Sequence, residues 1–155
     1  MGVTAAPRLE FAFEGRIEIE PPTDLGVRSG FCRRMFPIIG GTVRGPRLNG
    51  RVLPGGVDHQ RIDPDGVVFL VATYVVQAND GAMIGVVNRG LRHGPVEAMA
   101  RSLAGETVDP SLFYFRTAPV FEPPDGPHAW LARHIFVCTA GREGQTVVLR
   151  YFIVF

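Results

Sequence analysis

The chain has 155 residues, a formal net charge of +1 at neutral pH and 46% hydrophobic residues, a composition typical of one ordinary globular domain. Its 19 glycines and 13 prolines leave it below the range of disordered chains. All 16 basic residues are arginines, and the lack of lysine excludes Schiff-base catalysis and a Walker-type phosphate loop. We expect a single domain over residues 1–155, with residues 1–7 as a loose arm.

The sequence gives no sign of membrane insertion or export. Its apolar runs are shorter than the roughly 20 residues that a membrane-spanning helix needs. The first residues lack the basic and apolar regions of a secretory signal. We therefore expect a cytoplasmic protein that does not cross a membrane.

The first half of the chain has the patterns of short strands. Residues 9–20 alternate between apolar and charged side chains, which predicts a half-buried strand. Pro21 and Pro22 end this strand, and a loop leads into an arginine-rich stretch in which a helix is not expected. Over residues 42–53, short apolar pieces interrupted by glycine and proline are typical of bent or bulged strands.

The second half continues the pattern with one exception. Asp-Gly pairs at 65–66 and 80–81 predict hairpin turns on either side of residues 67–77. Both faces of that run are apolar, so it is buried on both sides or lines a cavity. Residues 95–104 begin with proline and end before glycine, which predicts one short helix. Further strands are predicted at residues 112–117, 130–138 and 146–155.

About eight to ten short strands and one helix predict an all-β, antiparallel architecture. A sandwich and a closed barrel both fit this count. The two-sided apolar strand, the repeated glycines and a strand at each end of the chain favour the barrel.

The stretch from Gly40 to Gln60, GGTVRGPRLNGRVLPGGVDHQ, resembles the signature of the domain of unknown function 3237 family, also called uncharacterised protein family 0311. The resemblance continues through Asp65-Gly66, Tyr74, Asp80-Gly81, Phe115-Arg116-Thr117, Phe121-Glu122 and Trp130-Leu131. It implies a small antiparallel barrel of calycin or lipocalin-like shape that binds small molecules. Such a barrel places its ligand inside.

The sharpest functional clue is the pair Asp58 and His59, because His59 stands where the resembled family commonly has an aromatic residue. The pair offers acid/base chemistry, provided that a turn or bulge lets both side chains reach one pocket. In the alternative interpretation, Asp58 accepts backbone hydrogen bonds in a turn while His59 faces solvent or fills the aromatic position.

Glu122 lies in an aromatic neighbourhood, where burial would raise its pKa and suit it to act as a general acid or base. The structural alternative is an ion pair between Glu122 and Arg116. Arg116 is also a candidate to hold a carboxylate or phenolate of a substrate.

Tyr74 and Trp130 are candidate ligand-binding residues. The Tyr74 phenol can donate a hydrogen bond to a substrate oxyanion, and Trp130 offers a flat wall to an aromatic ligand. Core packing is the alternative role for both.

The remaining residues point away from metal and nucleic acid. The histidines at 59, 93, 128 and 134 show no metal-ligand spacing. Between residues 25 and 57 there are arginines and no acid, namely Arg28, Arg33, Arg34, Arg44, Arg47 and Arg51. With so small a net charge and no nucleic-acid motif, a solvated face, an interface or attraction of an anionic substrate fits this strip better than nucleic acid.

These patterns predict a cofactor-independent lyase, isomerase or cyclase that moves protons on a small oxygenated metabolite, aromatic or polyketide-like, inside the barrel. Asp58, His59 and Glu122 would transfer protons, with Tyr74, Arg116 and Trp130 binding the substrate. The alternative is a carrier or sensor barrel without catalysis. We expect no metal, no cofactor and a homodimer.

Overall fold

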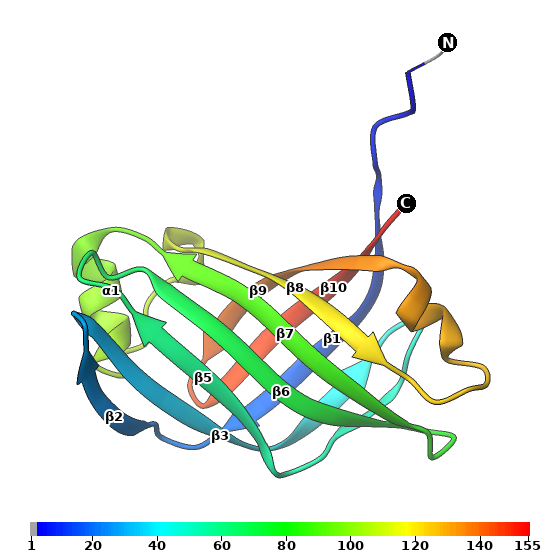
Figure 1. Cartoon of the computed structure of the whole chain (residues 1–155), viewed down its shortest axis with the longest axis horizontal. Coiled ribbons are helices and arrows are strands. Elements are labelled where there is room, and N and C mark those ends of the chain that lie inside the picture. Colours follow the sequence, from blue (N-terminus) through cyan, green and yellow to red (C-terminus); the bar gives the residue numbers. More distant parts are fainter. Residues whose placement is uncertain (1–2) are drawn as a thin grey trace.

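The computed structural model describes residues 3–155, and one antiparallel sheet contains almost all of its regular structure (Figure 1). The strands are β1 (Leu9–Ile19), β2 (Thr23–Arg28), β3 (Phe31–Arg44), β4 (Gly50–Val52), β5 (Gly56–Ile62), β6 (Val68–Ala78), β7 (Met83–His93), β8 (Tyr114–Glu122), β9 (Ile135–Glu143) and β10 (Thr146–Val154). One α-helix, α1 (Val96–Leu103), and two 3₁₀ turns, Pro110–Leu112 and Ala129–Arg133, interrupt them.

The sheet closes because β1 pairs with β10 on one side and with β3 on the other. The ring runs β1, β10, β9, β8, β7, β6, β5, β3 and back to β1, which makes eight strands. β2 extends β3 outside the ring, and β4 lies between β3 and β6. The predicted all-β barrel is confirmed.

The long strand β3 pairs with two other strands of the ring: its first half pairs with β5 and its second half with β1. Gly41 lies where β3 crosses to β1 and has φ +144°. A Cβ atom at this position would lie 2.2 Å from the Arg16 carbonyl oxygen. Only glycine allows β1 and β3 to approach so closely, and the closure of the barrel depends on that approach.

One end of the barrel is packed with aromatic rings. Phe13 stacks on Tyr151 with ring centroids 4.5 Å apart, and Phe121 meets Phe136 edge to face at 4.9 Å. Leu131, from the second 3₁₀ turn, is fully buried in the same core. Such close packing leaves the other end, beside α1, as the place for a cavity.

The predicted helix over residues 95–104 is confirmed as α1, with Pro95 just before its first residue. The predicted strand over residues 130–138 is wrong for its first residues, because Ala129–Arg133 form a 3₁₀ turn. The apolar side chains there pack over the end of the barrel instead of joining the sheet. The stretch after Pro22, expected as a loop, forms the β2–β3 hairpin.

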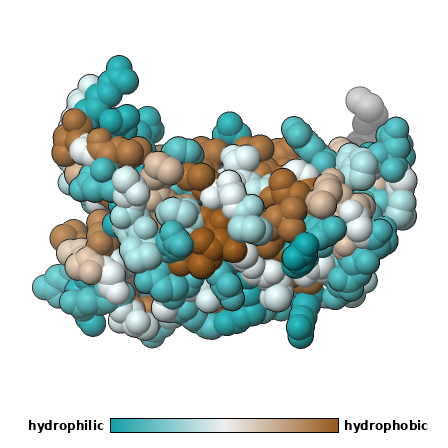
Figure 2. Space-filling view, turned by 90° about the horizontal axis from the view of Figure 1, so that it is seen from below, coloured by the Kyte–Doolittle hydropathy of each residue, from teal (hydrophilic) through white to brown (hydrophobic). Residues whose placement is uncertain are grey.

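Hydrophilic residues cover most of the rim of the molecule, while apolar residues gather near the middle of the face in Figure 2.

Of the predicted loose arm, residues 3–7 are exposed and form no helix or strand, and residues 1 and 2 lie outside the described residues. Over residues 3–155, no helix is long and apolar enough to span a bilayer.

Gly41→Ala should destabilise the protein by about 3–5 kcal/mol, because strain at positive φ adds to a clash with backbone atoms. Gly55→Ala is the matched control, since Gly55 also has positive φ but has nothing within 4 Å of the added carbon. We expect this control to lose only about 1–2 kcal/mol. Urea unfolding of both variants measures the difference, and equal losses would show that β1 and β3 tolerate a wider spacing.

Candidate functional site in the barrel cavity

A cavity opens inside the barrel at the end beside α1, and the empty space within and in front of it amounts to about 610 Å³, open solvent included. Alternate residues of the ring strands face inward, and each of the eight ring strands contributes at least one side chain to the wall. The polar residues of the wall are Arg34, Asp58, Gln60, Tyr74, Asn88, Arg92, Thr117 and Arg142. The apolar residues include Ile17, Ile19, Phe36, Ile38, Leu70, Val147 and Leu149.

Strand pairing places Asp58 beside Phe36 of β3 and Ala72 of β6. Asn88 of β7 is paired with the other side of Ala72. Because Ala72 is small, the two polar side chains flank an open stretch of wall. Tyr74 lies further along β6, toward the packed end.

The carboxyl group of Asp58 is held on one side only. Gln60 Nε2 donates to Asp58 Oδ2 at 3.0 Å, while Oδ1 is buried and accepts no hydrogen bond from any residue in the range 3–155. Burial raises the pKa of Asp58, and the hydrogen bond from Gln60 and the charge of Arg92 oppose that rise without cancelling it. A buried carboxyl with a free oxygen and a raised pKa is suited to exchange protons with a ligand.

The Tyr74 and Tyr151 hydroxyls are hydrogen-bonded to each other in the buried interior. Burial raises the pKa of both phenols, so both stay protonated at neutral pH. Tyr74 thus brings a neutral hydroxyl group to the cavity.

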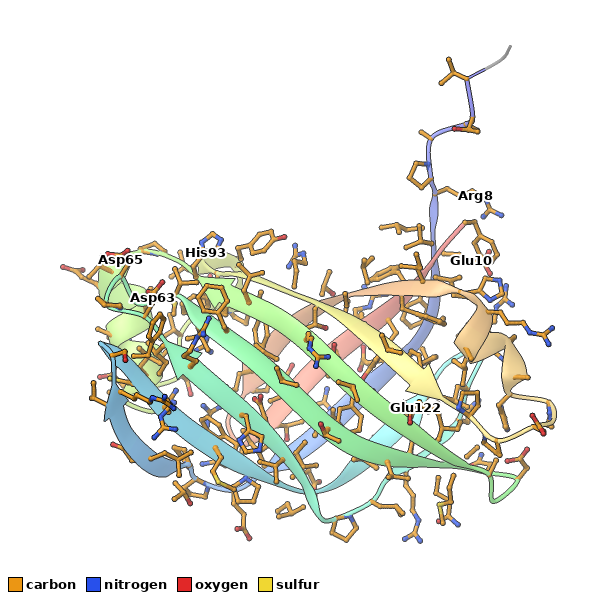
Figure 3. The ribbon with its side chains drawn as sticks, viewed as in Figure 1. Arg8, Glu10, Asp63, Asp65, His93 and Glu122 are labelled. Atoms are coloured by element: carbon orange, nitrogen blue, oxygen red, sulfur yellow. The ribbon has the colours of Figure 1, made fainter. Side chains whose placement is uncertain are left out.

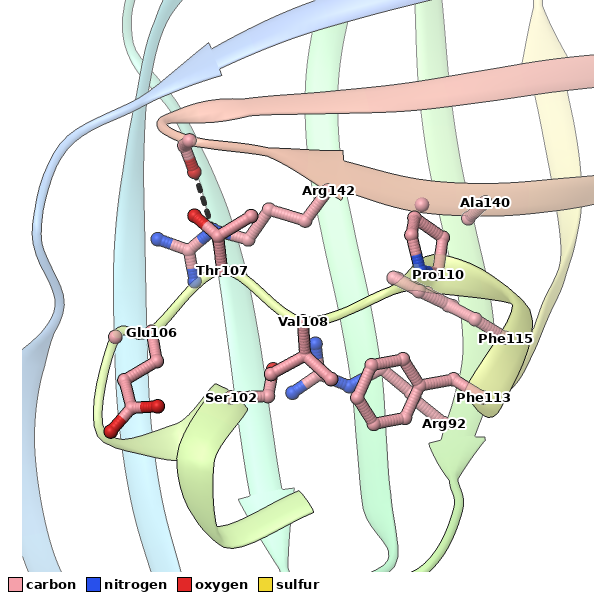
Figure 4. Close-up of a pocket in the computed structure, with 13 residues that line it drawn as sticks. Arg92, Ser102, Glu106, Thr107, Val108, Pro110, Phe113, Phe115, Ala140 and Arg142 are labelled. Atoms are coloured by element: carbon pink, nitrogen blue, oxygen red, sulfur yellow. Dashed lines mark hydrogen bonds between the residues drawn. The ribbon is translucent and has the colours of Figure 1, made fainter. Parts of the chain in front are cut away.

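Three arginines line the cavity at the end beside α1. Arg34 Nη1 donates to the Leu103 carbonyl oxygen at the end of α1 (3.2 Å), and Arg142 Nε donates to the Gly144 carbonyl oxygen (2.8 Å). Arg92 and Arg142 also border an outer pocket beside the segment 105–110 (Figure 4). The two guanidinium groups therefore stand between that outer pocket and the barrel interior.

The structure does not bring His59 or Glu122 to this cavity. His59 is exposed on the outer face of β5, because it directly follows the inward-facing Asp58 on a regular strand. Glu122 is exposed at the end of β8, and Figure 3 shows it far from His93, which lies at the α1 end. No turn or bulge occurs at Asp58 to make the predicted pair converge.

Arg116 and Trp130 also lie outside the cavity. Arg116 is exposed and donates to its neighbour, the Phe115 carbonyl oxygen, at 2.9 Å. Over residues 3–155 it forms no ion pair with Glu122, so the structural alternative for these two residues is absent as well. Trp130 packs against Phe136 at the aromatic end, with ring centroids 5.9 Å apart.

Sequence reasoning did not single out Gln60, Asn88, Arg92, Thr117 or Arg142, and it included Arg34 only as a member of the arginine strip. Of that strip, Arg34 alone lines the cavity. A signal for Arg142 was present, since Phe136, Cys138, Ala140 and Arg142 follow one another at every second position. The predicted strand ends at residue 138, four positions before Arg142, whereas β9 continues to Glu143. Within residues 3–155, no three His, Cys, Asp or Glu side chains are grouped as metal ligands would be.

The family described as protein of unknown function DUF3237 matches residues 7–154. The chain belongs to this family. A UPF0311 protein of Clostridium acetobutylicum is 41% identical over 144 residues, which is 92% of this chain and 91% of that protein. The crystal structure of a conserved protein of unknown function from Rhodopseudomonas palustris has 38% identity and a TM-score of 0.94, covering 98% of this chain and 100% of that one.

A more distant barrel of similar fold is the crystal structure of a protein from Penicillium herquei described as an enzyme. It covers 100% of both chains with a TM-score of 0.74 and 22% identity. At this identity, the likeness establishes a shared fold.

Asp58→Asn should make the folded protein more stable at alkaline pH. Because burial raises the pKa of this carboxyl in the folded state, stability is lost as the pH rises through the range between its unfolded and folded pKa values. The amide avoids this loss, so we expect a higher melting temperature than wild type at pH 8, by about 2–4 °C for each kcal/mol relieved.

The difference between the two melting temperatures should narrow toward pH 4, where the wild-type carboxyl is increasingly protonated in both states. Asp65→Asn, at an exposed turn position, is the control and should follow the wild-type curve. A variant that is less stable than wild type at pH 8 would contradict a raised pKa of Asp58 in the folded protein.

Proposed function

We propose that this protein is a cofactor-independent acid/base enzyme, of the lyase, isomerase or cyclase type, acting on a small oxygenated metabolite inside the barrel. The observation that carries the proposal is Asp58, an enclosed carboxyl with a raised pKa and an Oδ1 atom that no residue in the range 3–155 contacts by a hydrogen bond, in the wall of a cavity. The apolar walls suit an aromatic or polyketide-like body. The Penicillium herquei protein, described as an enzyme, supports catalysis in this fold.

In the proposed chemistry, the Asp58 carboxylate takes a proton from one atom of the ligand and becomes a carboxylic acid. The electron pair left on the ligand is delocalised to an oxygen, as in an enolate or phenolate, and the Tyr74 hydroxyl, from the same cavity wall, is the proposed neutral donor to that oxygen. Asp58 then returns the same proton to a different atom. The protein ends in its starting state, so no cofactor is consumed.

The second candidate is a binding barrel that holds its ligand without changing it. The positions of His59 and Glu122 favour this candidate, because both predicted partners of Asp58 are exposed outside the cavity. A carrier or sensor needs only the cavity and its polar groups.

Deuterium exchange separates the two candidates even when the natural substrate and product are unidentified. β-Diketones, phenols and hydroxylated naphthalenes are incubated with the protein in D₂O, and both incorporation of solvent deuterium and conversion are followed by NMR and mass spectrometry. For any compound that responds, Asp58→Asn should lower the rate by about 10²–10⁴-fold, the usual contribution of a general acid/base. Full turnover by Asp58→Asn would eliminate the proposed base.

His59→Gln and Glu122→Gln are the matched controls. Both side chains are exposed and away from the cavity, so these variants should retain wild-type exchange rates. A compound that binds and returns without exchange, with an affinity unchanged in Asp58→Asn, would favour the binding barrel.

A further inference from the structure

The cavity wall contains more positive charge than its acids can balance. Arg34, Arg92 and Arg142 line it together with the single carboxyl of Asp58. Within residues 3–155, none of these three arginines forms an ion pair. The acid that borders the adjoining outer pocket, Glu106, pairs instead with Arg101 at 2.7 Å.

Arg92 is the most enclosed of the three, with only 6% of its surface exposed. Its guanidinium carbon lies 5.5 Å from the ring centre of Phe113 and 5.6 Å from that of Phe115. No acceptor for its N–H groups is found among residues 3–155, since none of the side-chain hydrogen bonds of this part of the chain starts from Arg92. The buried side-chain atoms without a partner in residues 3–155 include no nitrogen of Arg92, so its N–H groups reach the cavity, where water or a ligand can accept their hydrogen bonds.

The other two arginines both lie against the ring of Phe36. Their guanidinium carbons lie 5.0 Å (Arg34) and 5.5 Å (Arg142) from the ring centre of Phe36. Burial, together with the charges of Arg34 and Arg142, lowers the pKa of Arg92 to about 10. The three cations thus repel one another inside a partly dry space.

We propose that Arg34, Arg92 and Arg142 form a carboxylate subsite at the cavity mouth, and that the ligand is an organic carboxylate whose apolar body lies against the inner walls. This inference rests on the proposed function, since it assigns the ligand class of the same cavity. Aromatic rings hold the guanidinium groups in place, and the planar fork of arginine matches the two oxygens of a carboxylate. The aliphatic and aromatic wall beyond them accepts the uncharged part of the molecule.

A pair of probes with the same shape and different charge tests the subsite. Calorimetry compares 2-naphthoate with 2-naphthamide, first on the wild-type protein. We expect the carboxylate to bind at least about tenfold more tightly than the amide, as one charge-assisted contact would provide. Arg92→Gln and Arg142→Gln should each reduce this preference to less than about threefold, because each removes a guanidinium that faces the anion.

Arg89→Gln is the matched control, because Arg89 lies on the same strand as Arg92 with an exposed side chain. It should keep the full preference for the carboxylate. Equal binding of the two probes, binding of neither, or a preference that survives in both mouth variants would overturn the proposal.

Melting temperatures of the variants distinguish a loss of ligand binding from a loss of folding. Because the three cations repel one another, the Arg92→Gln variant should melt at a temperature no lower than that of the wild type in the absence of ligand. A clearly lower melting temperature would assign Arg92 a structural role and overturn its part in the subsite.

The outcome is separable from the catalytic proposal. The probes report binding alone, so a carboxylate preference in a protein that exchanges no deuterium would leave an anion-binding barrel. Asp58-dependent exchange without such a preference would leave an enzyme for uncharged substrates.

Discussion

The double pairing of β1, with β10 on one side and β3 on the other, gives this protein an inside, and the site depends on that closure. In a closed sheet, successive side chains of each strand point alternately to the barrel interior and to the solvent. Asp58 faces inward, and His59 must therefore face outward. The same rule brings Arg34, Arg92 and Arg142 to one cavity from three strands that are distant in the sequence.

The two ends of the barrel have opposite energetic roles. The aromatic end, around Phe13, Phe136 and Tyr151, is closely packed and stabilises the fold. The end beside α1 buries charged and polar groups with few partners among residues 3–155, including the unpartnered oxygens of Asp58, Asn88 and Thr117. The packing of the aromatic end favours folding, whereas burial of polar groups at the end beside α1 opposes it. Such a local cost is common in binding sites whose polar groups are paired only when the ligand is bound.

The barrel was predictable from the sequence because its signals are local: alternation in residues 9–20, Asp-Gly turns at 65–66 and 80–81, and a short helix after Gly94. Asp58 and Tyr74 were predicted as site residues and lie in the cavity wall. The pairing of Asp58 with His59 required a bulge that regular pairing with Ala72 and Val71 excludes. Arg92 and Arg142 could not be found from spacing alone, since their meeting depends on strand register around the whole ring.

The arginine subsite and the acid/base proposal reinforce each other through the electrostatics of one carboxyl. In the free protein, the charges of Arg92 and Arg34 are among the influences that lower the pKa of Asp58, against the larger effect of burial. A carboxylate bound at the mouth would neutralise much of that positive charge and displace water from the cavity, and both changes move the pKa of Asp58 upward. A carboxylate with a higher pKa is a stronger base, closer to the neutral range in which a general base works best. Binding of an anionic substrate at Arg34, Arg92 and Arg142 would therefore strengthen the group that is proposed to act on it.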